Sequence, residues 1–331
     1  MKAVIFSDMQ YYHNPSKSQV LSDGTYTWLN EQLRITEVIF QYAIDNGVPN
    51  IIFGGDLFEE KNRINVQTYN RVWGLYKKWS KQFDYFILNT GNHDFYNENR
   101  DSSLLPFSSL GIFIAKETTD VATGGDIIRV IPYGKGLGGD LIIPDVGVRH
   151  YLVTHENIEG LTVGKNEYVH GDPIDKNLFK DWDLVFNGHI HKPQVVDNIV
   201  NIGSPMIQDW GEEGEVKRFI HLDGDSYKSI PINGPSFYTL DGLTEERVEQ
   251  LFKDDKNFFR VNVEASQVSH KIFKKWNVSP HIIKAKKREL RLTKQDSVSD
   301  EVNQYVDISE TQLDKNKLKK LGGEITHEGT S

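Results

Sequence analysis

Short apolar runs, each followed by a polar or charged residue, recur through the first two thirds of the chain. Runs of this length that are apolar throughout are typical of strands buried on both faces of a sheet. We predict strands at residues 3–7, 51–53, 85–89, 112–115, 127–132, 151–154, 183–187 and 199–202, and a closing hairpin at about 217–223 and 227–232.

Two stretches between the early strands have apolar residues at every third or fourth position instead. One runs from Leu33 to Ala43 and ends near Gly47, and the other runs from Val66 to Tyr76. This spacing places the apolar side chains on one face of a helix. Helices that alternate with buried strands form β-α-β units, so we predict an α/β fold with a parallel sheet.

The pattern changes near Gly234 and Pro235. The residues that follow predict a small α+β domain with strands at 237–240, 258–263 and 282–285 and helices at 244–253 and 266–276. From about residue 296 the chain is charged and has few apolar residues, which predicts a partly disordered tail. We therefore expect three parts, namely residues 1–233, residues 234–294 and a C-terminal tail of residues 295–331.

Composition limits the class of protein. The formal net charge of −9 argues against a protein that coats nucleic acid non-specifically, but it leaves room for a local basic groove. The chain has no cysteine, which excludes disulfides and thiolate metal sites. The first apolar run is too short for a signal peptide, and no run approaches the roughly 18 apolar residues of a membrane span. These features predict a soluble cytoplasmic protein without a membrane segment.

The residues that follow five of the predicted strands can all bind metal ions through oxygen or imidazole nitrogen. They are Asp8 and Gln10, Asp56, Asn92 and His93, His155, and His189 and His191. Open α/β sheets bind ligands at the carboxyl ends of their strands. One aspartate there can cap a turn, and one histidine is more often structural, but five such strand ends favour a metal centre. Two divalent ions about 3.5–4 Å apart need roughly this many ligands and one shared carboxylate, for which Asp56 is the natural bridge.

The order of these residues resembles that of the calcineurin-like metallophosphoesterases. The motifs are Asp8-x-Gln10, Gly55-Asp56, Gly91-Asn92-His93-Asp94, His155 and Gly188-His189-x-His191. Three stretches are similar to the SbcD branch of that family, namely residues 54–58, residues 188–194, and Gly203-Ser204-Pro205 followed by Gly211-Glu212-Glu213. This branch comprises the nuclease subunits of a double-strand-break repair complex and has phage-encoded relatives. The resemblance covers about residues 1–225.

The resemblance implies a four-layered αββα sandwich with a small α+β DNA-binding cap, and two Mn²⁺ ions, with Mg²⁺ as the alternative. It implies hydrolysis of phosphodiester bonds in DNA, by an exonuclease or an endonuclease of DNA repair, recombination or replication. It also implies an ATPase partner of the SbcC type that binds the C-terminal segment. A homodimer is left open.

The same resemblance assigns roles to single residues. Asp8, Gln10, Asp56 and His191 would bind the first ion, and Asp56, Asn92, His155 and His189 the second. His93 would stabilise the transition state or protonate the leaving oxygen. The candidate DNA contacts are Lys284, Lys286, Lys287, Arg288 and Arg291, for which the alternative is a solvated charged face.

Gln10 departs from the family pattern, which usually has histidine at this position. Its amide oxygen is a neutral and harder donor than imidazole, so we expect the first ion to bind more weakly, or water to take the place of Gln10. Two other functions remain alternatives. One is a small-molecule or protein phosphatase with the same fold, and the other is an inactive scaffold whose first metal site has been lost.

Overall fold

The structure is a computed structural model that describes residues 1–97, 101–123, 125–135, 141, 147–164, 172–283, 298–308 and 314–328. The chain forms two compact units. One consists of Met1–Val261 with His270–Pro280, and the other consists of Asn262–Ser269 with His281–Ser331. The basic run predicted to contact DNA lies at 284–294 and so falls outside the described residues.

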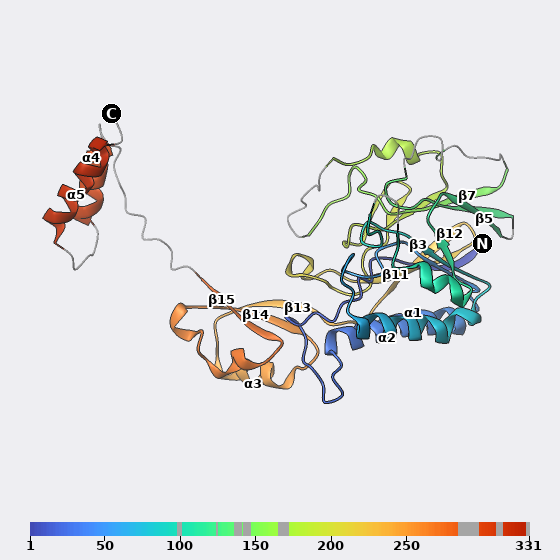
Figure 1. The fold of residues 1–331 in the computed structure, drawn as a ribbon, viewed down its shortest axis with the longest axis horizontal. Helices are drawn as coiled ribbons and strands as arrows, with labels where there is room; N and C mark the ends of the chain where they lie inside the picture. The colour runs from blue at the N-terminus through green and yellow to red at the C-terminus, as the bar shows by residue number, and fades with distance from the viewer. Residues whose placement is uncertain are drawn as a thin grey trace. The chain divides into compact units, whose positions relative to one another are not determined.

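The first sheet has six strands in the order β12-β11-β1-β2-β3-β4 (Figure 1). Its parallel strands are β1 (Lys2–Phe6), β2 (Asn50–Phe53), β3 (Tyr85–Asn89) and β4 (Phe113–Ala115). The hairpin of β11 (Arg218–Asp223) and β12 (Ser226–Pro231) joins β1 in antiparallel orientation. β1, β2 and β3 are buried over nearly their whole length, as expected for parallel strands that are covered on both faces.

The second sheet also has six strands, in the order β5-β6-β7-β8-β10-β9. Its parallel strands are β6 (Asp126–Val130), β7 (Arg149–Thr154), β8 (Leu184–Asn187) and β10 (Ile199–Asn201). The edge strands β5 (Thr119–Thr123) and β9 (Gln194–Val196) run antiparallel to their neighbours. The sequence pattern does not predict these two edge strands.

The two sheets pack face to face and share one apolar core. Ile5 and Ile52 enter this core from the first sheet, and Val153 and Phe186 enter it from the second. The outer face of the first sheet is covered by α1 (Thr27–Asp45) and α2 (Val66–Trp79), which contact each other and lie side by side in Figure 1. The short helix η1 (Ser80–Gln82) lies between α2 and β3 in the chain, and η2 (Leu105–Leu110) lies between β3 and β4.

The outer face of the second sheet is covered differently. Phe179, which ends the short 3-10 helix η4 (Lys176–Phe179), and Trp182 pack there with Ile158 and Leu161 from loops. The two-sheet sandwich confirms the predicted α/β fold class. Among the described residues, loops and η4 take the place of α-helices in the layer outside the second sheet. No helix in these residues is long and apolar enough to cross a membrane.

The small α+β region contains a three-stranded sheet in the order β13-β14-β15. Its elements are β13 (Phe237–Asp241), α3 (Glu245–Lys253), β14 (Phe258–Val263), η6 (Ala265–Gln267), η7 (Lys271–Lys274) and β15 (Val278–Ile282). The prediction of a helix at 266–276 is wrong, because the structure has the two short 3-10 helices η6 and η7 there. The Gln267 side chain accepts from Glu264 N at 3.2 Å and caps the start of η6. The His270 ring accepts from Ile272 N at 3.2 Å and begins the separate turn η7, which divides the segment.

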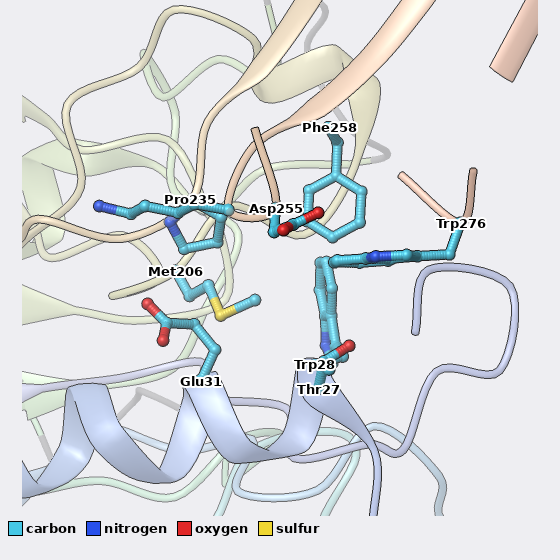
Figure 2. A pocket seen from close by; sticks show the side chains of 9 residues that line it. Thr27, Trp28, Glu31, Met206, Pro235, Asp255, Phe258 and Trp276 are labelled. Carbon is cyan, nitrogen blue, oxygen red and sulfur yellow. The ribbon is translucent and has the colours of Figure 1, made fainter. Parts of the chain in front are cut away.

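Aromatic side chains of this region pack against α1. The Phe258 ring lies 5.4 Å from the ring of Trp28 in α1 and 5.4 Å from the ring of Trp276. These residues border a cavity of about 240 Å³ (Figure 2). Its lining includes the carboxylates of Glu31 and Asp255 but no histidine, so it lacks the imidazole donors of the predicted metal centre.

The C-terminal segment contains two helices where the sequence predicts a partly disordered tail. They are α4 (Val298–Ile308) and α5 (Lys315–Glu328), which contact each other. Val306 is buried, and Lys319 Nζ lies 2.6 Å from Asp307 Oδ1. The few apolar residues of the segment thus suffice for a helix pair because they recur at helical spacing. The boundaries predicted near residues 234 and 295 stay predictions.

Candidate metal centre

Five strand ends meet at one edge of the sandwich. The loops after β1, β2 and β3 come from the first sheet, and those after β7 and β8 come from the second. Backbone hydrogen bonds join these loops, since Asp8 N donates to Gly55 O at 2.9 Å and Gly188 N donates to Thr154 O at 3.0 Å. The fold therefore brings together predicted site residues that lie far apart in the sequence.

Asp8, Asp56 and His155 form the centre of this cluster. All three are buried, and one ligand atom of each lies within 4.8 Å of those of the other two. His155 Nε2 is 3.4 Å from Asp56 Oδ2 and 3.9 Å from Asp8 Oδ1. Two carboxylates and an imidazole at these distances are a donor set that a divalent cation can use.

His191 extends the cluster on the side of Asp8. Its Nε2 lies 3.9 Å from Asp8 Oδ1, and its Nδ1 lies 3.0 Å from Glu212 Oε1. Because an ionised carboxylate only accepts hydrogen bonds, Nδ1 carries a hydrogen, and Nε2 is the atom that faces Asp8. Gln10 lies in the same loop as Asp8, and its backbone N donates to Asp56 O at 3.0 Å. Coordination by the Gln10 amide oxygen stays a prediction.

Asn92 and His189 extend the cluster on the other side. Asn92 Oδ1 lies 3.2 Å from His155 Nε2 and 3.0 Å from His189 Nδ1. His189 N also faces Asp8, at 3.1 Å from Oδ1. The ring of Tyr133 stacks on the His189 ring at 5.9 Å, with an angle of 29° between their planes. The sequence does not identify Tyr133, because its role depends on this contact in space.

His93 lies beside the cluster. Its backbone N donates to Asp56 Oδ1 at 2.7 Å, and its Nδ1 bonds to the carbonyl oxygen of Glu59. A carbonyl only accepts, so Nδ1 carries the hydrogen and Nε2 is free to face the site, at 4.0 Å from Asp56 Oδ2. The His93 side chain is 26% exposed, which leaves it open to a substrate. Its predicted catalytic role stays a prediction.

The loops that carry the predicted ligands are conformationally unusual. Four of these residues have left-handed backbone angles, with φ values of 54° at Asp8, 44° at Gln10, 60° at Asp56 and 78° at His189. Such angles cost roughly 1–3 kcal/mol for a non-glycine residue and cluster at functional sites. Glycine is required at Gly188, where a Cβ would lie 2.7 Å from His155 Nδ1.

Two buried polar residues hold these loops in place. Asp94 accepts hydrogen bonds from Asp56 N at 2.8 Å, Leu57 N at 3.0 Å and Gly91 N at 2.8 Å. Asp94 belongs to the motif that starts at Gly91, but the motif alone does not reveal that its carboxylate fixes the loop after β2.

The second of these residues is Gln32, which lies on α1. Its Nε2 donates to Met9 O at 2.9 Å and to Gln10 O at 3.0 Å, and its Oε1 accepts from Tyr12 N at 3.1 Å. Gln32 is fully buried on the apolar face of α1. A polar residue at an apolar position of a helix is the signal by which the sequence could have revealed it.

The charges in the cluster depend on one another. Burial favours a raised pKa for the Asp56 carboxyl, but the imidazoles of His155 and His93 lower this pKa below its usual range. Burial lowers the pKa of His155, but the carboxylates of Asp56 and Asp8 outweigh it and raise this pKa to about 10. Burial raises the pKa of Asp94 to about 7, with a further contribution from the charge of Asp56. Buried carboxylates that need a positive charge beside them fit a divalent cation.

The geometry therefore fits a divalent cation beside Asp8, Asp56 and His155. A pair of cations stays a prediction, with Asp8, Gln10, Asp56 and His191 for one and Asp56, Asn92, His155 and His189 for the other. A pocket of about 230 Å³ adjoins these residues. It is lined by His189, His191 and Lys192, among others, so a substrate that enters it reaches two of the predicted ligands.

Comparison with known proteins identifies the family. Residues 1–193 match the model of the calcineurin-like phosphoesterases. The chain belongs to this family. The match confirms the resemblance that the strand-end motifs predict and includes every predicted metal ligand.

Two curated proteins are similar to this chain in sequence. Exonuclease subunit 1 of Enterobacteria phage T4 is 23% identical over 201 residues, which cover 58% of this chain and 59% of that protein. Putative phosphoesterase 078R of Invertebrate iridescent virus 3 is 24% identical over 194 residues, which cover 55% of this chain and 54% of that protein. The chain thus spans less than two thirds of the length of these relatives.

A solved structure of the nuclease MPE from Pseudomonas putida also matches. It overlaps 70% of this chain and 87% of its own at 13% identity, with a TM-score of 0.32.

Proposed function

We propose that the protein is a two-metal phosphodiesterase that hydrolyses DNA as the nuclease subunit of a repair or recombination complex of the SbcCD type. It would work in the cytoplasm, which is that of a host cell if the protein is encoded by a phage. The observation that carries this proposal is the convergence of five strand ends on the buried carboxylates of Asp8 and Asp56.

The proposed reaction divides the work between the cations and the protein. When bound, the two cations would stabilise the attacking and leaving oxygens of an in-line displacement at phosphorus. Asp56 would bridge them, because its carboxylate can give one oxygen to each. In its imidazolium form His93 would donate the Nε2 proton to the leaving oxygen, while its Nδ1–H stays bonded to the carbonyl of Glu59, and it would be left as the neutral ring with its hydrogen on Nδ1. The ligand set of oxygen and imidazole supports Mn²⁺, with Mg²⁺ as the alternative.

DNA is the proposed substrate for two reasons. The phage T4 relative is named as an exonuclease subunit. The basic run at Lys284, Lys286, Lys287, Arg288 and Arg291 would supply contacts to phosphates. The small α+β region would act as the DNA-binding cap.

An ATPase of the SbcC type is the proposed partner, and the C-terminal segment is the proposed point of attachment. Exposed apolar side chains on both helices of this segment support it, namely Tyr305 at 50% and Leu321 at 53% exposure. Deleting residues from about 296 should spare cleavage of a small diester and weaken association with the ATPase. Unchanged association would contradict this point of attachment.

The test of the whole proposal is a Mn²⁺ titration with three substrates in parallel, namely linear duplex DNA, a single-stranded DNA circle and a phosphomonoester. Metal-dependent hydrolysis of the linear duplex or the circle is the expected result, and the two substrates separate exonuclease from endonuclease activity. The Asp56→Asn variant should be inactive, whereas the exposed Asp45→Asn control should match the wild type. Hydrolysis of the phosphomonoester alone would favour a phosphatase. Bound Mn²⁺ without any hydrolysis would favour an inactive scaffold.

A further inference from the structure

Glu212 contacts the imidazole of His191 at Nδ1, whereas the other ring nitrogen, Nε2, faces Asp8. Glu212 is only 4% exposed, and its Oε1 lies 3.0 Å from His191 Nδ1. The other carboxylate oxygen, Oε2, accepts a hydrogen bond from Gln208 N at 2.9 Å. Both oxygens are thus engaged, and the carboxylate has one defined orientation relative to the ring.

Lys217 holds this carboxylate and the backbone of His191 together. Its Nζ lies 2.7 Å from Glu212 Oε2 and donates to His191 O at 3.0 Å. Lys217 is as deeply buried as Glu212, and its ammonium also contacts Glu215 Oε2 at 2.8 Å. A buried carboxylate with a buried counter-ion keeps its charge, so His191 has a permanent acceptor at Nδ1.

The residues on either side of Glu212 contact the small α+β region. Glu213 accepts hydrogen bonds from Thr239 N at 2.7 Å and from Thr239 Oγ1 at 2.8 Å, and Thr239 belongs to β13. The ring of Trp210 lies 4.6 Å from the ring of Phe237 in the same strand. The guanidinium of Arg260 in β14 lies 4.7 Å from the Trp210 ring. Helix η5 (Trp210–Glu212) and Glu213 therefore connect His191 to β13 and β14.

We propose that Glu212 is a positioning residue for His191, and that residues 210–213 link the orientation of this imidazole to strand β13. The proposal rests on the metal centre described under the proposed function. A histidine that binds metal through one ring nitrogen gains a fixed tautomer and orientation when a carboxylate accepts from the other. A shift of β13 would move Glu213 and Glu212 together, and with them the ring that faces Asp8.

The experiment is a calorimetric Mn²⁺ titration of the full chain, which reads metal binding without activity. Glu212→Ala should weaken one of two binding phases by about 10- to 100-fold and leave the other unchanged, as loss of such a carboxylate does in other metal sites. Glu212→Gln should recover part of the loss, because its amide oxygen can still accept from Nδ1. The matched control is Glu215→Gln, which contacts the same ammonium of Lys217 but not His191, and it should bind Mn²⁺ as the wild type does.

Loss of folding is separated from loss of positioning by a second variant. Glu212→Ala leaves the Lys217 ammonium with less compensation, so the double variant Glu212→Ala with Lys217→Met removes both charges. It should fold, as judged by circular dichroism, and show the same phase weakened at least as much, because the bond from Lys217 to His191 O is lost as well. Wild-type affinity in a folded Glu212→Ala variant, or an equal loss in both phases, would overturn the role of Glu212. A wild-type protein that binds no Mn²⁺ would instead refute the metal centre itself.

The link to β13 is tested by Thr239→Val, which removes the hydroxyl that donates to Glu213 but keeps the size of the side chain. We expect the same binding phase to weaken by at least 3-fold, but by less than in Glu212→Ala. The reason is that complete loss of a hydrogen bond to a carboxylate changes an equilibrium constant by about tenfold or more. Tyr238→Phe, at the exposed neighbouring position of β13, is the control. A Thr239→Val isotherm identical to the wild type would show that β13 does not influence His191.

Discussion

Replacing Gln32 by leucine should damage the metal centre from a distance. Gln32 lies on α1 and contacts no predicted ligand side chain, but its amide binds the backbone on both sides of Gln10. Leucine has a similar size and a high helix propensity, so α1 itself should be unaffected. The substitution removes the hydrogen bonds that hold the loop after β1 in its left-handed conformation.

The cost follows from the bonds that are lost. Met9 O has a second donor, Gln208 Nε2 at 3.5 Å, so the main cost falls on Gln10 O and Tyr12 N. Each buried polar group that loses its partner costs about 1–3 kcal/mol. Part of this is offset by burial of the apolar leucine side chain, about 1 kcal/mol. We therefore expect the free energy of unfolding to fall by about 3 kcal/mol.

The assay is urea unfolding of the metal-free protein, followed by a Mn²⁺ titration of the folded variant. The control is Gln41→Leu on the same helix, where the exposed Gln41 side chain donates to Asp45 Oδ1 at 2.8 Å. This control should change the free energy of unfolding by no more than about 0.5 kcal/mol. Gln32→Leu should also weaken Mn²⁺ binding by about tenfold or more. A loss of stability below about 1 kcal/mol, together with unchanged Mn²⁺ affinity, would show that Gln32 does not hold the loop after β1.

Four further predictions concern the site itself. Asp56→Ala should lose bound metal and nuclease activity together while it stays folded, and full metal occupancy measured by elemental analysis would rule out the bridging role. His93→Gln should slow hydrolysis by about 10²-fold or more at unchanged metal affinity, and near-native turnover would show that His93 has another role. Gln10→His should shift the weaker phase of a Mn²⁺ titration to lower concentration and raise Zn²⁺ affinity, whereas identical isotherms would exclude Gln10 as a ligand. Burial raises the pKa of Glu212, but the neighbouring ammonium of Lys217 and imidazole of His191 outweigh burial and lower this pKa from 4.5 to about 2. The charge of Glu212 therefore contributes about 3 kcal/mol of stability to the metal-free protein above pH 4.5. This contribution is lost as the pH falls towards 2. The difference in free energy of unfolding between wild type and Glu212→Gln should then shrink by about 2 kcal/mol from pH 6 to pH 3, and a constant difference would contradict the shift.

The sequence predicts the elements whose signal is local. The strands that lead to Asp8, Asp56 and His155 are buried on both faces, so their apolar runs are continuous and easily recognised. The edge strand β5 has polar residues and depends on pairing with β6, which no local pattern reveals. The helix predicted at 266–276 fails because side-chain bonds such as that of His270 to Ile272 N divide the segment.

The residues that support the site are harder to predict for a different reason. Gln32, Asp94 and Glu212 act through backbone or side-chain partners that the fold brings near them. In the sequence, Gln32 is a polar residue on the apolar face of a helix, and Asp94 and Glu212 are members of motifs with no indicated role of their own. Strand ends locate the predicted ligands, but only tertiary structure identifies what orients them.

The proposed bridging of two divalent cations by Asp56 can be observed in a crystal of the wild-type protein grown with Mn²⁺ and measured for anomalous scattering at the manganese edge. We expect two peaks about 3.5–4 Å apart, with the Asp56 carboxylate between them, one beside His191 and the other beside His155 and His189. A single peak, or peaks only outside this cluster, would contradict the bridging.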